Sequence, residues 1–175
     1  MTLTLTIRAA RLSDVSAVDT LLARSYPRLL AADYPPSVMV TALPIIARAR
    51  PELLASGRYF LAFGLDGRLL GTGGWSAAAP GPSDQPEGPP GAAAVGHVRH
   101  VATDPDAVRQ GIGRAVMGAV LTAARNAGIA RMECLSTRTA VPFYMSLGFR
   151  VLGTVEVPLR MGIVFPAVRM INDQI

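Results

Sequence analysis

The chain has 175 residues, the size of one domain, and half of them are hydrophobic, enough for a packed core. Its net charge of +5 comes from arginine alone, since the 17 basic residues include no lysine. These arginines are scattered singly and aromatic residues are few, which disfavours nucleic-acid binding. No apolar run is as long as a membrane span, and no signal peptide is visible. One cysteine excludes an internal disulfide, so we expect a cytoplasmic protein with a single domain over residues 1–175.

The first third of the chain predicts one strand and several helices, from polar–apolar alternation and then from helical spacing of apolar residues. Asp14 stands where a residue can cap the first helix, and Pro44 should interrupt or kink the second. In chain order we expect a strand at 4–8, a helix from Ser13-Asp14 to near Tyr26-Pro27, a helix at 37–49 and a short one at 51–56.

A hairpin and a long loop follow. Residues 58–65 and 68–75 alternate as strands do, and Asp66-Gly67 between them is a favoured two-residue turn. Residues 78–94 are rich in proline and glycine, which is typical of a flexible loop. This loop is either a lid or an insertion, and both readings stay open.

The stretch from His97 to Gly128 combines a strand, a glycine-bearing turn and a helix. Val98–Val101 is a β-branched run, and Asp104-Pro105-Asp106 breaks it. The helix begins on Gly111-Ile112-Gly113 and should end at Gly128. Its predicted buried face consists of Ile112, Val116, Ala119, Val120 and Ala123.

This arrangement is suited to holding an anion. Glycine lets a ligand approach the backbone, and the N–H groups of the first helical turn carry the positive end of the helix dipole. Arg109 and Arg114 flank that turn and can add phosphate contacts. Two known phosphate loops do not fit, since Gly113 is followed by Arg114-Ala115 rather than Lys-Ser/Thr, and position 116 is valine rather than glycine.

The remaining elements complete a mixed order of strands and helices. A strand at 131–136 precedes a tyrosine-bearing helix at 139–147, and two closing strands lie at 149–157 and 162–170. The predicted order is therefore a strand, helices, three strands, a helix, a strand, a helix and two strands.

Two motifs in this order resemble those of the GCN5-related N-acetyltransferases. Val108–Gly113 resembles the pyrophosphate loop Arg/Gln-x-x-Gly-x-Gly/Ala, with valine at its first position and the arginine one place later. Ala140–Phe149 resembles the family's later helix, which carries a tyrosine and ends in Gly-Phe. The resemblance implies an α+β fold, in which a largely antiparallel sheet of about seven strands is flanked by helices. It also implies acetyl-CoA as the cofactor.

The resemblance further implies roles for individual residues. The pantetheine arm would pair with the backbone of the central strand, and the pyrophosphate would lie at the helix start. Tyr144 would be the acid that protonates the leaving thiolate. The implied cofactor-binding residues are Val101, Ala102, Thr103, Arg109, Gln110, Gly111, Ile112, Gly113 and Arg114.

The identity of the general base is open to three interpretations. His97 stands four residues before Val101, where the family keeps a strand-borne base, and Glu133 on the neighbouring strand is the alternative. Direct attack with proton loss to water would need neither. Strict alternation places His97 and His100 on opposite faces of their strand. Cys134 is expected to be a small buried residue, and two histidines with one cysteine offer no metal site.

We therefore expect an N-acetyltransferase that acts on a primary amine of a small molecule or peptide, by direct attack in a ternary complex. A non-catalytic acyl-CoA-binding or regulatory module on the same fold is the alternative. Nucleotide binding without coenzyme A is a third hypothesis. The closing strands of the resembled fold often pair in dimers, so a homodimer is also expected.

Overall fold

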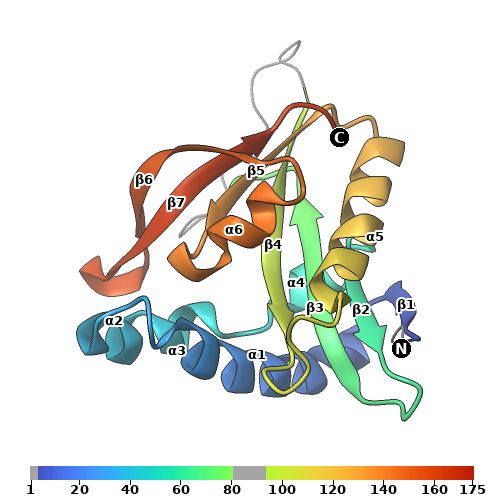
Figure 1. Ribbon diagram of the computed structural model, residues 1–175, viewed down its shortest axis with the longest axis horizontal. Helices are drawn as coiled ribbons and strands as arrows, with labels where there is room; N and C mark the ends of the chain where they lie inside the picture. The colour runs from blue at the N-terminus through green and yellow to red at the C-terminus, as the bar shows by residue number, and fades with distance from the viewer. Residues whose placement is uncertain (1–3, 81–93) are drawn as a thin grey trace.

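One seven-stranded sheet organises the computed structural model, which describes residues 4–80 and 94–175 (Figure 1). The strand order is β1-β2-β3-β4-β5-β7-β6, and every neighbouring pair is antiparallel except β4 with β5. The strands are β1 (Thr6–Ala9), β2 (Tyr59–Phe63), β3 (Leu69–Ser76), β4 (Val95–Thr103), β5 (Arg131–Ser136), β6 (Arg150–Pro158) and β7 (Val164–Asn172). The predicted α+β class with a largely antiparallel sheet is confirmed.

Helices cover both faces of the sheet. Side chains of α5 and α6 pack into one hydrophobic cluster, and those of α1 to α4 pack into two others on the opposite face. No helix in the described part of the chain is long and apolar enough to cross a membrane. The helices are α1 (Val15–Leu30), α2 (Pro36–Thr41), α3 (Leu43–Ile46), α4 (Pro51–Leu54), α5 (Ile112–Asn126) and α6 (Val141–Met145), with 3-10 turns η1 (Leu12–Asp14), η2 (Arg138–Ala140) and η3 (Arg160–Gly162).

The predicted order of elements is confirmed, with corrections around α1. The helix does not end near Pro27 but continues to Leu30, because one lost backbone hydrogen bond is outweighed by burial of side chains such as Leu30. Asp14 does not cap α1 through its side chain. Its carboxylate instead accepts the N–H of Arg11 at 2.7 Å and two hydrogen bonds from Arg8 at 2.8 Å. Pro44 breaks the second helix into α2 and α3, as predicted.

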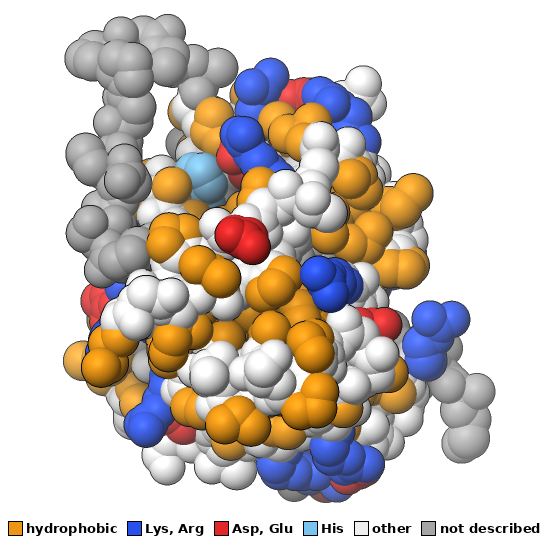
Figure 2. Space-filling view, turned by 90° about the vertical axis from the view of Figure 1, so that its left-hand side faces the viewer, with side chains coloured by type: hydrophobic (Ala, Val, Ile, Leu, Met, Phe, Trp, Pro, Cys, Tyr) orange, Lys and Arg blue, Asp and Glu red, His pale blue; other side chains and the backbone are white. Residues whose placement is uncertain are grey.

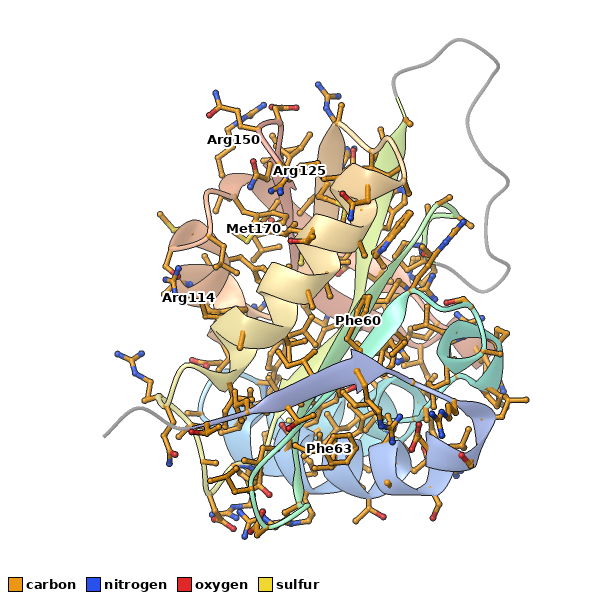
Figure 3. The ribbon with its side chains drawn as sticks, turned by 90° about the vertical axis from the view of Figure 1, so that its right-hand side faces the viewer. Phe60, Phe63, Arg114, Arg125, Arg150 and Met170 are labelled. Carbon is orange, nitrogen blue, oxygen red and sulfur yellow. The ribbon has the colours of Figure 1, made fainter. Side chains whose placement is uncertain are left out.

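Helix α5 begins and ends where the sequence predicts. Gly111, with φ of 82°, precedes its first residue, and Gly128, with φ of 83°, follows its end. Ile112, Val116 and Val120 are buried as predicted, whereas Ala119 and Ala123 are only half-buried. Met117 and Ala124 are buried in addition, so the face that contacts the sheet is rotated slightly from the predicted one. Figure 3 shows α5 lying across the sheet, with Arg114 near its start and Arg125 near its end.

The β6–β7 hairpin and α2 carry exposed hydrophobic side chains. Val40 is 74% exposed and Met161 is 96% exposed at the turn between the two strands. Figure 2 shows hydrophobic side chains gathered over this face. Pairing of the closing strands in a homodimer stays a prediction.

The predicted loop at 78–94 lies, apart from its ends, outside the described residues.

Candidate active site

A fork opens between β4 and β5 because their pairing stops at His97, the third residue of β4. The paired residues are Val95 with Arg131, Gly96 with Met132 and His97 with Glu133. Beyond His97, β5 pairs only with β7, so within the described residues the β5-facing edge of β4 has no strand partner. Such an edge can bind an extended ligand as an added strand. The predicted pantetheine-binding residues 101–103 lie along it.

A β-bulge shapes the same part of β4. Gly74 pairs with Arg99 and Thr72 pairs with Ala102, so two residues of β4 stand opposite one residue of β3. His100 lies within the bulge and has φ of 46°. The bulge interrupts the alternation from which we predicted that His97 and His100 face opposite sides. That prediction is therefore wrong, and Arg99 lies close enough to lower the pKa of both imidazoles.

His97 is placed to accept a proton. It stands at the last paired position of the fork, opposite Glu133 on β5 and Ser76 on β3. Burial lowers its pKa more than the nearby Glu133 carboxylate raises it, so the imidazole is neutral at neutral pH. The carboxylate of Glu133 accepts hydrogen bonds from Arg169 at 2.9 and 3.1 Å, so both of its oxygens already have a partner.

His100 is a neutral, half-buried histidine. Burial, with the Arg99 and Arg50 charges, lowers its pKa to about 4, and the Glu52 carboxylate opposes this shift. Among the described residues its Nδ1 atom has no hydrogen-bond partner. Its carbonyl oxygen accepts the Tyr59 hydroxyl at 3.0 Å, which ties the bulge to β2.

Tyr144 lies at the fork with its phenol protonated. Its ring is buried between Phe143 and Phe149 in edge-to-face contacts with centroid separations of 5.1 and 5.4 Å. Its hydroxyl lies close enough to the thiol of Cys134, the residue that follows Glu133 on β5, for each group to affect the pKa of the other. Burial raises the pKa of Tyr144 well above 10 and that of Cys134 to about 12. Cys134 is therefore the inert buried residue that we expected.

The turn before α5 presents backbone N–H groups at the surface. Residues 108–111 are exposed, and both Arg109 and Gly111 adopt left-handed conformations, with φ of 66° and 82°. No side chain accepts a hydrogen bond at the N-cap of α5, which is 15 residues long. Its first N–H groups therefore point outward together with the positive end of the dipole. The turn fits a diphosphate by these criteria.

Gly113 and Arg114 connect that turn to α6. A Cβ atom on Gly113 would lie 3.2 Å from the Phe143 ring and 3.6 Å from Thr103, so glycine permits close packing of α5 against α6 and β4. Arg114 donates to the Ser146 hydroxyl at 3.2 Å. The two arginines predicted to contact phosphate thus lie on either side of the turn.

Tyr26 of α1, where we expected only the end of a helix, is a further residue at the fork. Its ring packs on both clusters of the α1 face. Burial raises the pKa of Tyr26 strongly, the Cys134 sulfur adds to this, and Tyr26 in turn contributes to the raised pKa of Tyr144. Its spacing of four and eight residues from the buried Leu22 and Val18 would have placed it on the inner face of the helix.

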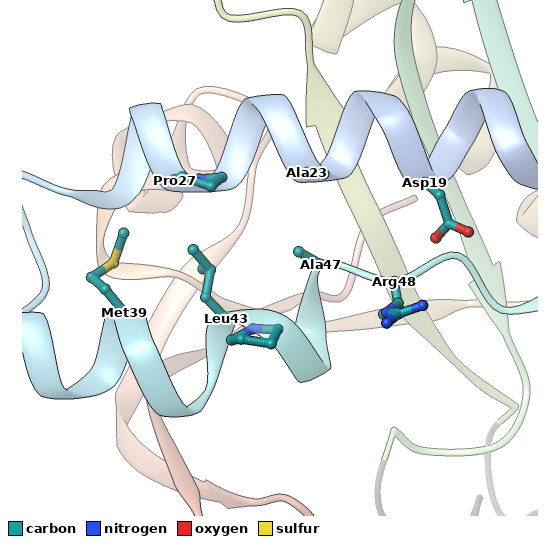
Figure 4. A pocket seen from close by; sticks show the side chains of 8 residues that line it. Asp19, Ala23, Pro27, Met39, Leu43, Ala47 and Arg48 are labelled. Carbon is teal, nitrogen blue, oxygen red and sulfur yellow. The ribbon is translucent and has the colours of Figure 1, made fainter.

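A separate groove of about 420 Å³ lies between α1 and α3 (Figure 4). It contains none of the residues predicted to act in catalysis or to bind the cofactor. We therefore do not assign the transfer chemistry to it. Its lining residues are Asp19, Ala23, Pro27, Met39, Leu43, Pro44, Ala47 and Arg48.

A sheet forked between two parallel strands, with a turn suited to an anion and a buried phenol beside it, is typical of acyl-CoA-dependent transferases. The model of the acetyltransferase (GNAT) domain matches residues 45–170, well over half of the chain. The chain therefore belongs to the GCN5-related N-acetyltransferase family.

Solved structures of similar fold support that assignment. A GCN5-related N-acetyltransferase from Rhodopseudomonas palustris is 18% identical with a TM-score of 0.71, covering 99% of this chain and 96% of its own. The PaiA N-acetyltransferase of Thermoplasma acidophilum, solved in complex with coenzyme A, is 14% identical with a TM-score of 0.69, covering 97% and 99%. A GCN5-related N-acetyltransferase from Kribbella flavida is 23% identical with a TM-score of 0.60, covering 97% of each chain. No curated protein sequence matches the chain.

Proposed function

We propose that this acetyltransferase moves an acetyl group from acetyl-CoA to a primary amine of a small molecule or peptide, by direct attack while both are bound. The proposal rests on one observation. The protonated, buried phenol of Tyr144 lies at the fork between β4 and β5, and the unpaired edge of β4 continues from this fork toward the turn before α5. PaiA, a structural neighbour, was solved with coenzyme A, which agrees with this choice of donor.

The chain's backbone would hold most of the cofactor. The N–H groups from Gly111 to Arg114 would bind the diphosphate, and Arg109 and Arg114 would add charge-assisted hydrogen bonds. The open edge of β4 at residues 101–103 would pair with the amide groups of the pantetheine arm. The valine at position 108, which departs from the family pattern, leaves these backbone contacts unaffected.

Tyr144 would donate a proton to the leaving group. When bound, acetyl-CoA supplies a thioester, whose carbon the amine attacks and whose sulfur departs as a thiol. The pKa of Tyr144 lies well above 10, so the phenol keeps its proton at neutral pH and can donate to a sulfur that becomes negative. The nearby Cys134 thiol, whose pKa the phenol affects, supports a location of the Tyr144 hydroxyl at the fork.

His97 is our choice of base. Its pKa is lowered, so it is neutral and can accept the proton that the amine loses, whereas Glu133 is held by Arg169. Burial of the same surroundings disfavours a charged acceptor, and Arg99 and Arg169 add to this effect while the Glu133 carboxylate opposes it. The amine would thus be bound in its uncharged, nucleophilic form.

The test is acetyl-CoA turnover on a panel of amines by the wild-type protein and Tyr144→Phe. We expect Tyr144→Phe to lower kcat roughly a hundredfold or more, because it removes the proton donor and keeps the ring packing. Since the chain has no lysine, no side-chain amine of the protein competes with the added acceptors. A Tyr144→Phe variant with full activity would refute the acid role.

Tyr34→Phe is the matched control. Tyr34 is also buried, but its hydroxyl donates to the carbonyl oxygen of Pro166 at 2.8 Å, a structural bond. Its loss should cost about 1 kcal/mol of stability and leave kcat unchanged. Coenzyme A binding without transfer to any amine would instead support the non-catalytic module. Protection against unfolding by ATP but not by coenzyme A would point to nucleotide binding.

A further inference from the structure

Asp104 is a buried carboxylate at the point where β4 leads into the cofactor turn. Its side chain is fully buried, and Arg24 of α1 donates to it at 3.1 Å. Arg68, from the β2–β3 hairpin, reaches it at 3.6 Å. The other Asp104 oxygen accepts the N–H of Asp106 at 2.9 Å, which folds the chain into the turn.

Asp106 extends this contact along α1. Its carboxylate is bound by Arg24 at 2.9 Å and by Arg28 at 2.8 Å. Arg24 and Arg28 are one helical turn apart and therefore share a face of α1. We call the four residues Arg24, Arg28, Asp104 and Asp106 the α1–turn clamp. It joins positions about eighty residues apart in the sequence.

The clamp fixes a segment that has few other anchors. Ala107 is buried, but the next four residues are exposed, and two of them, Arg109 and Gly111, hold left-handed conformations. A left-handed arginine is unfavourable by about 1 kcal/mol, so this geometry needs support from the residues around it. Among the described residues, the clamp supplies the ionic contacts at the start of the segment. It thus sets the direction of the N–H groups that follow.

The clamp also balances charge beside the anion site. Asp104 and Asp106 stand a few residues before Gly111, where two carboxylates would repel a diphosphate. Arg24 and Arg28 offset them at close range. Loosening the clamp at an arginine therefore disturbs the geometry and leaves a carboxylate that repels the diphosphate, whereas removing the Asp106 charge disturbs the geometry and takes a repelling charge away.

We infer that Arg24 and Arg28 are positioning residues for the cofactor: through Asp104 and Asp106 they hold the turn in the shape that binds the diphosphate of coenzyme A. The inference rests on the proposed function, which identifies the ligand of that turn. A preorganised turn binds its ligand more tightly because less conformational freedom is lost on binding. The clamp residues themselves take no part in the transfer chemistry.

The experiment is calorimetric titration with coenzyme A, together with steady-state kinetics, on Arg24→Gln, Arg28→Gln and Asp106→Asn. All three side chains are 44–57% exposed, so the variants should fold, which thermal unfolding would verify. We expect Arg24→Gln and Asp106→Asn each to raise the Kd roughly tenfold, and Arg28→Gln to raise it roughly threefold. The KM for acetyl-CoA should rise in parallel, with kcat at saturation unchanged. Arg24→Lys should recover part of the affinity.

Arg48→Gln is the control, since it removes the same charge from an exposed position outside the clamp. It should bind coenzyme A as the wild type does. Tighter binding by Asp106→Asn would show that only charge matters and would overturn the positioning role. Wild-type affinity in Arg24→Gln would overturn it as well, and the proposed function would survive. If the wild-type protein does not bind coenzyme A, both fail together.

Discussion

The cofactor turn and the transfer fork are built in different ways, although both adjoin β4. The turn uses backbone N–H groups from one contiguous stretch, Gly111 to Arg114, in which two of the four residues are glycine. The fork uses side chains from α1, β4, β5 and α6, whose phenol, thiol and imidazole groups have pKa values shifted by burial. In the proposed function, one region would bind the cofactor through local backbone geometry, and the other would react through side chains that tertiary packing brings together.

This difference predicts a separation of effects. A change in the turn should alter affinity for coenzyme A and leave the rate at saturation intact, because no group there touches the reacting atoms. A change at the fork should alter the rate and leave that affinity intact. The predictions below test whether the two regions separate in this way, beginning with the largest effect.

Gly113→Val should weaken coenzyme A binding roughly a hundredfold. A β-branched side chain at this position would meet the Phe143 ring, which a Cβ atom alone would approach to 3.2 Å, and would push the start of α5 away from β4. Calorimetry with coenzyme A measures the loss, and kcat at saturating acetyl-CoA should change by less than threefold.

The matched control is Gly118→Val in the same helix. Gly118 is exposed, and nothing lies within 4 Å of the position its Cβ would take. This variant should bind coenzyme A normally and be slightly more stable than the wild type, because valine has the higher helix propensity. Equal losses of affinity in both variants would mean that the helix as a whole, rather than its first turn, controls binding.

His97→Gln should lower kcat roughly fiftyfold at pH 7 with the Kd of coenzyme A unchanged. The pKa of His97 is lowered, so the wild-type rate should be flat near neutrality and fall only below about pH 6.5. In the variant the loss should shrink as the pH rises toward the pKa of the amine, where the acceptor is already deprotonated. A pH–rate profile of both proteins measures this, and parallel profiles would exclude His97 as the base.

His100 should make the fold sensitive to mild acid. Its pKa is about 4 in the folded protein and near 6.5 when unfolded, so below pH 6.5 the unfolded chain binds a proton that the folded chain does not. Stability should therefore be complete above pH 6.5 and decline by about 2.5 kcal/mol as the pH falls to 4.5. His97 acts in the same direction. Urea unfolding of the wild type and His100→Asn between pH 7 and 4.5 tests this, and equal slopes would assign the decline to other groups.

These two regions also differ in how far the sequence predicted them. The turn and α5 follow from local signals, namely paired glycines, helical spacing and a terminal glycine, and they formed where expected. The fork does not follow from local signals, because it depends on where β5 leaves β4 and on a bulge that shifts His100. The pairing of Arg24 with Asp104 and the position of Tyr26 against Cys134 likewise join distant segments. A helix can also pass through Pro27 when the residues beyond it are buried.

Asp14→Asn should have the smallest effect and serves as a reference outside both regions. The Arg8 guanidinium holds the pKa of Asp14 down at about 2, and Asp14 also accepts the N–H of Arg11. Asparagine keeps an acceptor for that N–H and removes the charge, so the loss at pH 7 should be about 1 kcal/mol. Because a lowered carboxyl pKa stabilises the fold above pH 4, the difference between the variant and the wild type should vanish as the pH falls from 4 to 2. Urea unfolding measures it, and any change in kcat or in coenzyme A affinity would show that the N-terminal segment contributes to the site as well.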